Sequence, residues 1–268
     1  MEETLITALK SAGDELMRHF GRQTGFSIKE SQSSIVTHAD LKSDDLISEI
    51  IRKDYPEHNI LSEESGFSNR NSDFTWVVDP LDGTSNFASS IPWFGVLIAI
   101  LEGDRPVMGG AYLPATNQLY LAYRGKGARK NGKRITMPES MGLRNSLVSF
   151  NVDFTDDEKV LDSGMETYKR LVRSARNIRC TNSLVDFLFT AEGKFGGVIN
   201  LFTRIWDIAA LGLIIEEAGG AMKYVTGKDI IFRLDSDTPG TNYPVVAGPP
   251  KILEELYESV LNGKSESD

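Results

Sequence analysis

The chain opens with two segments whose apolar residues recur at helical spacing. Across residues 4–20, apolar side chains from Leu5 to Phe20 lie three or four positions apart. That spacing gathers them on one stripe of an amphipathic helix. A second such pattern runs over about residues 40–55 and stops before Pro56, as helices commonly do. We therefore predict two amphipathic helices at the start of the chain.

The pattern then changes to short runs rich in β-branched and aromatic residues, which favour strands. These runs cover residues 75–78, 94–101, 107–113 and 119–123. The dipeptide Asn131-Gly132 is a strong signal for the turn of a β-hairpin. We predict a largely antiparallel sheet in the middle of the chain.

Strand and helix patterns alternate in the second half. Strands are predicted near residues 146–150, 177–180, 197–200 and 221–225, and helices near residues 156–173, 183–192 and 206–218. Such alternation is typical of a layered α/β arrangement. We predict one domain over residues 1–268, with two helices and the antiparallel sheet in residues 1–140 and an α/β half in residues 141–268.

Composition is ordinary for a globular protein, but the charge narrows the possible partners. Hydrophobic residues make up 40% of the 268 residues, charged residues make up 25%, and the net charge is -9. An acidic protein is repelled by nucleic-acid backbones and anionic membranes, so we expect neither as a partner. Bound cations would reverse the local potential and allow a phosphorylated substrate.

The single cysteine and the N-terminus indicate a cytoplasmic protein. Cys180 alone cannot form an intramolecular disulfide or a thiolate zinc site, and we expect it to be a small buried residue. The start of the chain lacks the basic residues of a signal peptide. The longest apolar run, residues 94–101, is too short to cross a bilayer.

Candidate chemistry is densest where the predicted strand at residues 75–78 ends. The strand runs directly into Asp-Pro-Leu-Asp-Gly-Thr-Ser at residues 79–85, which places Asp79 and Asp82 on a tight turn. Carboxylates together with a backbone carbonyl are the ligands that Mg²⁺ prefers. The backbone N–H groups of residues 83–85 would begin a helix, where phosphate is favoured. Taken alone, the segment could equally be a polar turn.

Two distant acidic segments favour a metal site over a plain turn. Ser-Glu-Glu-Ser-Gly at residues 62–66 follows two apolar residues and places Glu63 at the end of a short strand. Asp207 is a lone carboxylate in the first turn of an otherwise apolar helix. By itself, that aspartate would be a helix cap. We interpret the three segments together as one site.

In these motifs the chain resembles the inositol monophosphatase family, within the lithium-sensitive, metal-dependent phosphatase superfamily that includes fructose-1,6-bisphosphatases and bisphosphate nucleotidases. The motifs are Glu-Glu-Ser, Asp-Pro-Leu-Asp-Gly-Thr-Ser-Asn-Phe and Trp-Asp-Ile-Ala-Ala, in the family's order. The resemblance covers nearly the whole chain. It implies an αβαβα five-layer sandwich of the inositol monophosphatase and fructose-1,6-bisphosphatase type. It also implies inhibition by lithium and a homodimer.

The resemblance implies two or three Mg²⁺ ions and assigns their ligands. Glu63, Asp79 and the Leu81 carbonyl would bind the first ion together with the substrate phosphate. Asp79, Asp82 and Asp207 would bind the second, and a third, weaker ion would share Glu63. One cation would activate a water while another neutralises the leaving alkoxide, the division of labour expected of such a site.

The implied catalytic residues are Glu63, Thr84 and Asp40. Glu63 and Thr84 would orient a metal-activated water for direct in-line attack, and Asp40 would polarise the Thr84 hydroxyl. Taken alone, Asp40 could be a helix cap. No nucleophilic side chain is required, and the three histidines show neither ligand spacing nor a triad context.

The segment that selects the substrate departs from the inositol-type pattern. An ungapped count back from Asp207 places the family's Gly-Thr-Ala segment on residues 181–183 and its ring-binding glutamate on Asn200. An amide forms weaker hydrogen bonds with hydroxyl groups than a charged carboxylate does. Asparagine at this position would therefore weaken selectivity for inositol. The expected substrate-binding residues are Gly83, Thr84, Ser85, Asn182, Ser183, Asn200 and Asp207.

The leading hypothesis is Mg²⁺-dependent hydrolysis of a small phosphate monoester, an inositol monophosphate-like polyol or sugar phosphate. The alternatives on the same scaffold are a sugar bisphosphatase, a phosphatase of NADP or adenosine bisphosphate, and a histidinol phosphate phosphatase. A non-catalytic regulator that binds metal or phosphate is disfavoured, because binding alone would not require both Thr84 and Asp40.

Overall fold

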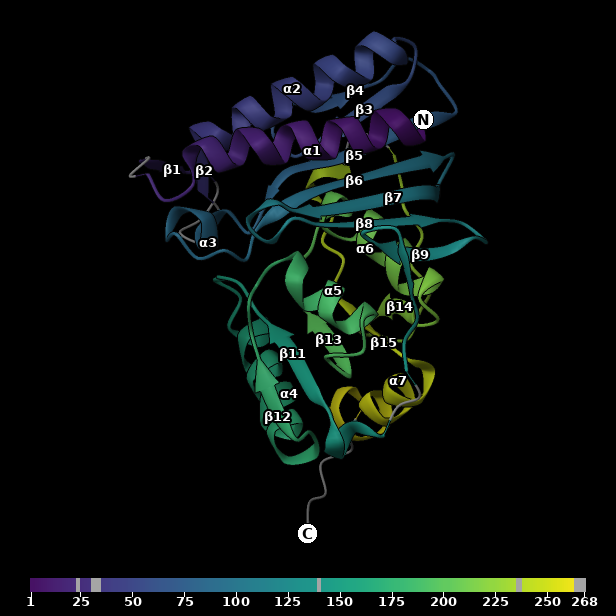
Figure 1. Ribbon diagram of the computed structural model, residues 1–268. Coiled ribbons are helices and arrows are strands. Elements are labelled where there is room, and N and C mark those ends of the chain that lie inside the picture. The colour runs from purple at the N-terminus through teal and green to yellow at the C-terminus, as the bar shows by residue number, and fades with distance from the viewer. Residues whose placement is uncertain (23–24, 30–34, 139–140, 235–237, 263–268) are drawn as a thin grey trace.

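The computed structural model describes residues 1–22, 25–29, 35–138, 141–234 and 238–262, and its elements stack in five layers (Figure 1). Helices α1 (Glu2–His19) and α2 (His38–Asp54) form the first layer, above an eight-stranded sheet. Helices α5 (Leu184–Ala191) and α6 (Ile205–Glu217) lie between this sheet and a five-stranded sheet. Helices α4 (Glu158–Ser174) and α7 (Pro250–Leu256) form the last layer. This order confirms the predicted αβαβα fold.

The eight-stranded sheet is antiparallel except for the pairing of β3 with β5. Its order is β10-β9-β8-β7-β6-β5-β3-β4. The strands are β3 (Asn59–Ser62), β4 (Gly66–Ser68), β5 (Phe74–Asp82), β6 (Gly95–Glu102), β7 (Arg105–Leu113), β8 (Gln118–Tyr123), β9 (Gly127–Lys130) and β10 (Lys133–Ile135). Asn131 and Gly132 join β9 to β10 with φ of +47° and +78°, as a two-residue hairpin turn of the favoured type requires. The predicted antiparallel sheet and hairpin are confirmed.

The five-stranded sheet contains the four predicted strands and one that the pattern did not predict. Its order is β12-β11-β13-β15-β14. The strands are β11 (Leu147–Asn151), β12 (Asn177–Arg179), β13 (Gly197–Asn200), β14 (Ala221–Tyr224) and β15 (Val245–Gly248). The unpredicted strand, β15, is fully buried. A short, wholly apolar run has no period that separates strand from helix, which explains the omission of β15. The helix α7 after it was not predicted either.

The remaining elements are short. They are the hairpin β1 (Phe26–Ile28) with β2 (Ile35–Thr37), the helix α3 (Thr84–Ala88), the 3-10 turns Pro114–Thr116, Leu143–Asn145 and Thr238–Gly240, and a π-helical turn at Tyr257–Leu261.

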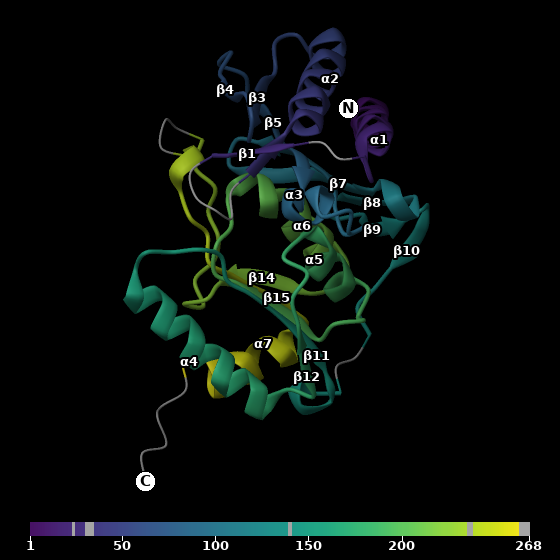
Figure 2. The ribbon, with the colours of Figure 1, turned by 90° about the vertical axis from the view of Figure 1, so that its left-hand side faces the viewer.

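Three apolar cores fill the spaces between the layers. One lies under α1 and α2, one between the two sheets around α5 and α6, and one between the second sheet and the outer helices. Figure 2 shows the order of these layers from a second side. Because α6 is covered on both sides, it is apolar almost all round, as a fully enclosed helix must be. Asp207 is an exception, because it places a carboxylate in the first turn of this enclosed helix.

Cys180 is exposed, so the prediction of a buried cysteine is wrong. It follows β12, which is an edge strand of the second sheet among the described residues. Among the residues that the structure describes, no helix is both long and apolar enough to span a bilayer.

Candidate active site

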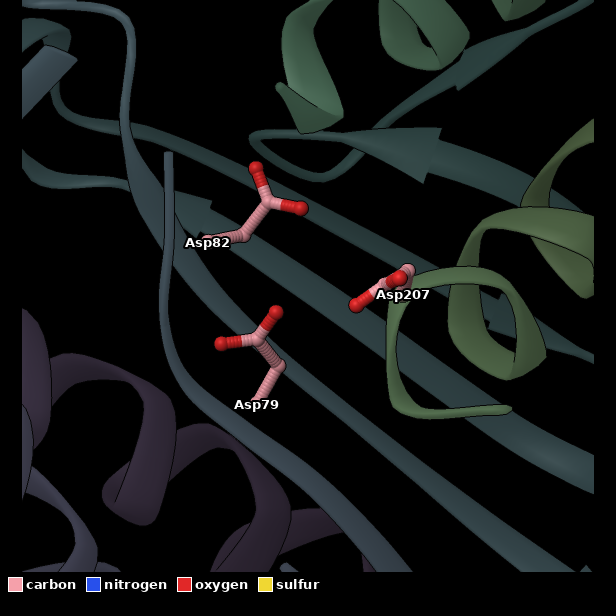
Figure 3. Close-up of side chains that lie close together, drawn as sticks. All are labelled: Asp79, Asp82 and Asp207. Atoms are coloured by element: carbon pink, nitrogen blue, oxygen red, sulfur yellow. The ribbon is translucent and has the colours of Figure 1, made fainter. Parts of the chain in front are cut away.

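Three buried or half-buried aspartates converge where β5 meets the start of α6 (Figure 3). One carboxylate oxygen each from Asp79, Asp82 and Asp207 lies within 4.8 Å of the other two. The β5–β6 register shifts between Asp79 and Asp82, and such an irregularity re-aims side chains at a strand end. Residues more than a hundred positions apart thus form one acidic cluster.

Local hydrogen bonds fix the three carboxylates in place. Asp79 Oδ1 accepts the Leu81 N–H at 3.0 Å. Asp82 Oδ1 accepts the Leu184 N–H at 2.6 Å, which ties the strand end to the start of α5. Asp207 Oδ2 accepts the Arg204 N–H at 2.6 Å. Asp207 is therefore a helix cap and a member of the cluster at once, because the cap uses only one of its oxygens.

Burial and mutual repulsion disfavour the charged forms of these carboxyls. Burial, and then the charge of Glu63, raise the pKa of Asp79 and of Asp207 well above the ordinary value. Burial raises the pKa of Asp82 to about 7. A divalent cation would relieve this repulsion, and a donor set made only of oxygens suits Mg²⁺. The residues present fit the metal that the sequence predicts.

The raised pKa values predict a stability that depends on pH and on Mg²⁺. A carboxyl whose pKa is higher in the folded state costs stability above that pKa, and the cost falls as the pH drops through it. In EDTA, we therefore expect Tm to rise between about pH 8 and about pH 6. Mg²⁺ should raise Tm more at the higher pH, because protons compete with it; at 100 times its Kd it would add about 2.7 kcal/mol.

Differential scanning calorimetry of the wild type and of Asp82→Asn measures this effect. The variant is needed because a second group titrates in the opposite direction. Burial lowers the pKa of His58, so His58 makes the folded protein less stable as the pH falls, which opposes the expected rise in Tm. We expect Asp82→Asn to show a smaller rise in Tm on acidification and a smaller Mg²⁺ effect. Equal Mg²⁺ effects in the two proteins would rule out Asp82 as a ligand.

Glu63 lies beside the cluster and is paired with a lysine. It follows β3, where its N–H donates to the Val78 carbonyl at 3.1 Å. Lys29 Nζ donates to Glu63 Oε1 at 2.9 Å and also pairs with Glu64. Burial raises the pKa of the Glu63 carboxyl, although Lys29 acts in the opposite direction. No sequence pattern pointed to Lys29.

Asp40 contacts Thr84, and it also caps α2. Its Oδ2 accepts the Thr37 N–H at 2.9 Å, and its Oδ1 accepts the Thr84 hydroxyl at 3.3 Å. The same hydroxyl lies 2.9 Å from the Leu81 carbonyl. Both interpretations of Asp40, as a helix cap and as a partner of Thr84, therefore hold in one geometry. Burial raises the pKa of Asp40 to about 6.

One cavity of about 700 Å³ contains nearly every predicted site residue. Its lining includes Glu63, Asp79, Leu81, Asp82, Gly83, Thr84, Ser85, Asn182, Ser183, Asn200 and Asp207. Asp40 is outside the lining and reaches it through Thr84. The three histidines are also outside it. His19 and His58 are half-buried and His38 is exposed, which confirms them as surface or partly packed residues.

The predicted substrate residues also have structural partners. Ser183 caps α5 through the Val185 N–H, and Asn200 Oδ1 accepts the Phe202 N–H at 3.1 Å. The Asn182 amide donates to Asp153 at 2.7 Å. Asp153 and Arg204 line the cavity as well, and the sequence analysis identified neither.

Comparisons with known proteins agree with this geometry. The model of the inositol monophosphatase family matches residues 1–265. The chain is 31% identical to a Nus factor SuhB of Pasteurella multocida, over 95% of this chain and 93% of that one. It is also 31% identical to a fructose-1,6-bisphosphatase/inositol-1-monophosphatase of Aquifex aeolicus, over 84% and 85% of the two chains.

A solved structure of an IMPase/NADP phosphatase complexed with Mg²⁺ and phosphate superimposes with a TM-score of 0.82 and 25% identity, over 98% of this chain and 95% of that one. The family model spans all three acidic segments and both sheets. The chain belongs to the inositol monophosphatase family.

Proposed function

We propose that the protein is a Mg²⁺-dependent phosphomonoesterase that acts on a small phosphorylated polyol or sugar. The observation that carries this proposal is the meeting of the Asp79, Asp82 and Asp207 carboxylates, within 4.8 Å of one another, at a cavity of about 700 Å³. Cavities of this size accommodate small-molecule ligands. The family and the Mg²⁺ and phosphate complex of the similar structure support it.

In this proposal the acidic residues hold Mg²⁺ and the neighbouring turn holds phosphate. Mg²⁺, bound by Glu63, Asp79, the Leu81 carbonyl, Asp82 and Asp207, would supply electrostatic stabilisation of the charge on the phosphoryl and leaving oxygens. The backbone N–H groups at the start of α3 have no earlier helical turn to bond. They would bind the phosphate oxygens, together with the Ser85 side chain.

Thr84 and Glu63 would orient the attacking water. The Thr84 hydroxyl has one proton, which it directs to Asp40 or to the Leu81 carbonyl. Its lone pairs therefore remain able to accept a hydrogen bond from a water. Glu63, which lines the cavity beside Lys29, would accept a second hydrogen bond from that water. The water is then aligned for in-line attack on the phosphorus.

The same scaffold also supports alternative activities. A sugar bisphosphatase, a nucleotide phosphatase or a histidinol phosphate phosphatase would use the same acidic cluster. A non-catalytic role is the alternative from another class, and curated relatives carry the name Nus factor. We also propose two or three Mg²⁺ ions, a homodimer and a cytoplasmic location.

Phosphate release across a panel of esters tests the proposal. The panel contains inositol 1-phosphate, fructose 1,6-bisphosphate, NADP, adenosine 3′,5′-bisphosphate and histidinol phosphate, each with Mg²⁺ and with EDTA. We expect the highest kcat/KM with inositol 1-phosphate and no turnover in EDTA. The absence of phosphate release from every ester in Mg²⁺ would sink the enzymatic proposal.

A further inference from the structure

Asn182 directs its side chain to another residue of the cavity wall. Its Nδ2 donates to Asp153 Oδ1 at 2.7 Å, across 29 positions of sequence. Asp153 follows β11, and Asn182 precedes α5. The bond therefore joins two separate segments of the lining and fixes the Asp153 carboxylate at the cavity.

The backbone around Asn182 is held in an uncommon conformation. Asn182 has φ of +49°, in the left-handed region that asparagine tolerates better than most residues. The fully buried Asp186 carboxylate accepts the N–H groups of Thr181 and Asn182 at 3.2 and 3.1 Å. These hydrogen bonds hold the turn, and the turn aims the Asn182 amide at Asp153.

Asp153 keeps one carboxylate oxygen that a ligand in the cavity could reach. It is half-buried, and within the described residues its second oxygen, Oδ2, accepts no hydrogen bond. Asn200 already uses its Oδ1 for the Phe202 N–H.

We propose that Asp153, positioned by Asn182, determines substrate specificity by accepting hydrogen bonds from hydroxyl groups on the alcohol part of the substrate. The inference rests on the proposed phosphatase function. It specifies a monoester whose alcohol is uncharged and rich in hydroxyl groups. A carboxylate repels a second phosphate, and Lys29, a cation of the lining, is already paired with two carboxylates.

Kinetics with two esters test this role. Inositol 1-phosphate carries several hydroxyl groups, whereas p-nitrophenyl phosphate carries none on its alcohol part. We expect Asp153→Asn to lower kcat/KM for inositol 1-phosphate about tenfold or more, mainly by raising KM. The reason is that hydrogen bonds to charged groups are stronger than those between neutral groups. The kcat/KM for p-nitrophenyl phosphate should change by less than about twofold.

Two further variants separate positioning from general damage. Asn182→Gly keeps the left-handed backbone but removes the amide, and we expect the same ester-selective loss as in Asp153→Asn, of smaller size. Asp162→Asn removes an exposed carboxylate of α4 outside the cavity and should resemble the wild type with both esters. Equal losses with the two esters in Asp153→Asn, or no loss, would overturn the inference.

Calorimetric titration separates the failure of this inference from the failure of the proposed function. With Mg²⁺ present, each protein is titrated with the non-hydrolysable phosphonate analogue of inositol 1-phosphate and with inorganic phosphate. We expect Asp153→Asn to weaken binding of the phosphonate about tenfold and to leave binding of phosphate unchanged. Unchanged binding of the phosphonate would refute the role of Asp153 whether or not the wild type hydrolyses any ester.

Discussion

Replacing Asp79 with asparagine is expected to lower kcat by roughly 10³-fold or more, since a bound metal supplies several kcal/mol of transition-state stabilisation. Asp79 is 2% exposed and lies between Glu63, Asp82 and Asp207, whose charges all act on it. Asparagine has nearly the same volume but no charge, so the site would lose its most enclosed anionic ligand. We expect the fold to persist, because the substitution removes a buried charge among like charges.

Two measurements establish this result. Phosphate release from inositol 1-phosphate gives kcat, and the Tm with and without Mg²⁺ reports metal binding apart from turnover. We expect Asp79→Asn to lose most of the Mg²⁺-dependent rise in Tm and to be at least as stable as the wild type in EDTA. The control is Asp104→Asn, whose side chain is 59% exposed on the turn between β6 and β7. Turnover near the wild-type rate would exclude Asp79 as an essential ligand.

The layered fold explains how the acidic cluster forms. Asp79 and Asp82 belong to a strand of the first half of the chain, whereas Asp207 belongs to a helix of the second half. Because α6 packs against the first sheet from the central layer (Figure 1), its first turn reaches the end of β5. The helix places one aspartate there at the start of a run that is apolar as far as Ile215, so the core and the site depend on the same packing.

The sequence predicted the features that depend on local spacing or on a motif. Asp79 and Asp82 are three positions apart at a strand end, and the turn chemistry marks them without any tertiary information. Asp207 and Glu63 became site candidates only in combination with that turn, because a single acidic residue at a helix or strand end has a simpler explanation as a cap; the resemblance assigned their roles. The structure brings all four to one cavity.

Features that arise from long-range contacts could not be predicted. Lys29 reaches Glu63 across 34 positions, and Asn182 reaches Asp153 across 29 positions; no local pattern marks either pair. The ungapped register placed Asn182 at the cavity, as the structure does. It could not reveal that the amide contacts Asp153, because side-chain direction depends on the left-handed turn.

Replacing Thr84 with alanine is expected to lower kcat by roughly 10²-fold while KM changes little, the scale for losing a group that positions a proton-transfer partner. The hydroxyl is held between the Leu81 carbonyl and Asp40 at 2.9 and 3.3 Å, so alanine would leave the water without this acceptor. Thr84→Ser retains the hydroxyl and should recover most of the activity.

A double-mutant cycle tests whether Asp40 acts through Thr84. Asp40→Asn alone should lower kcat, because an amide has one acceptor oxygen, and the NH2 group that then faces Thr84 cannot accept its hydroxyl as Asp40 Oδ1 does. Added to Thr84→Ala, it should cause little further loss, since residues that act as one unit are not additive. Asparagine can still accept the Thr37 N–H that Asp40 accepts at 2.9 Å, which preserves the cap of α2. If the two losses in kcat multiply, the two residues are not coupled, and Asp40 does not act through Thr84.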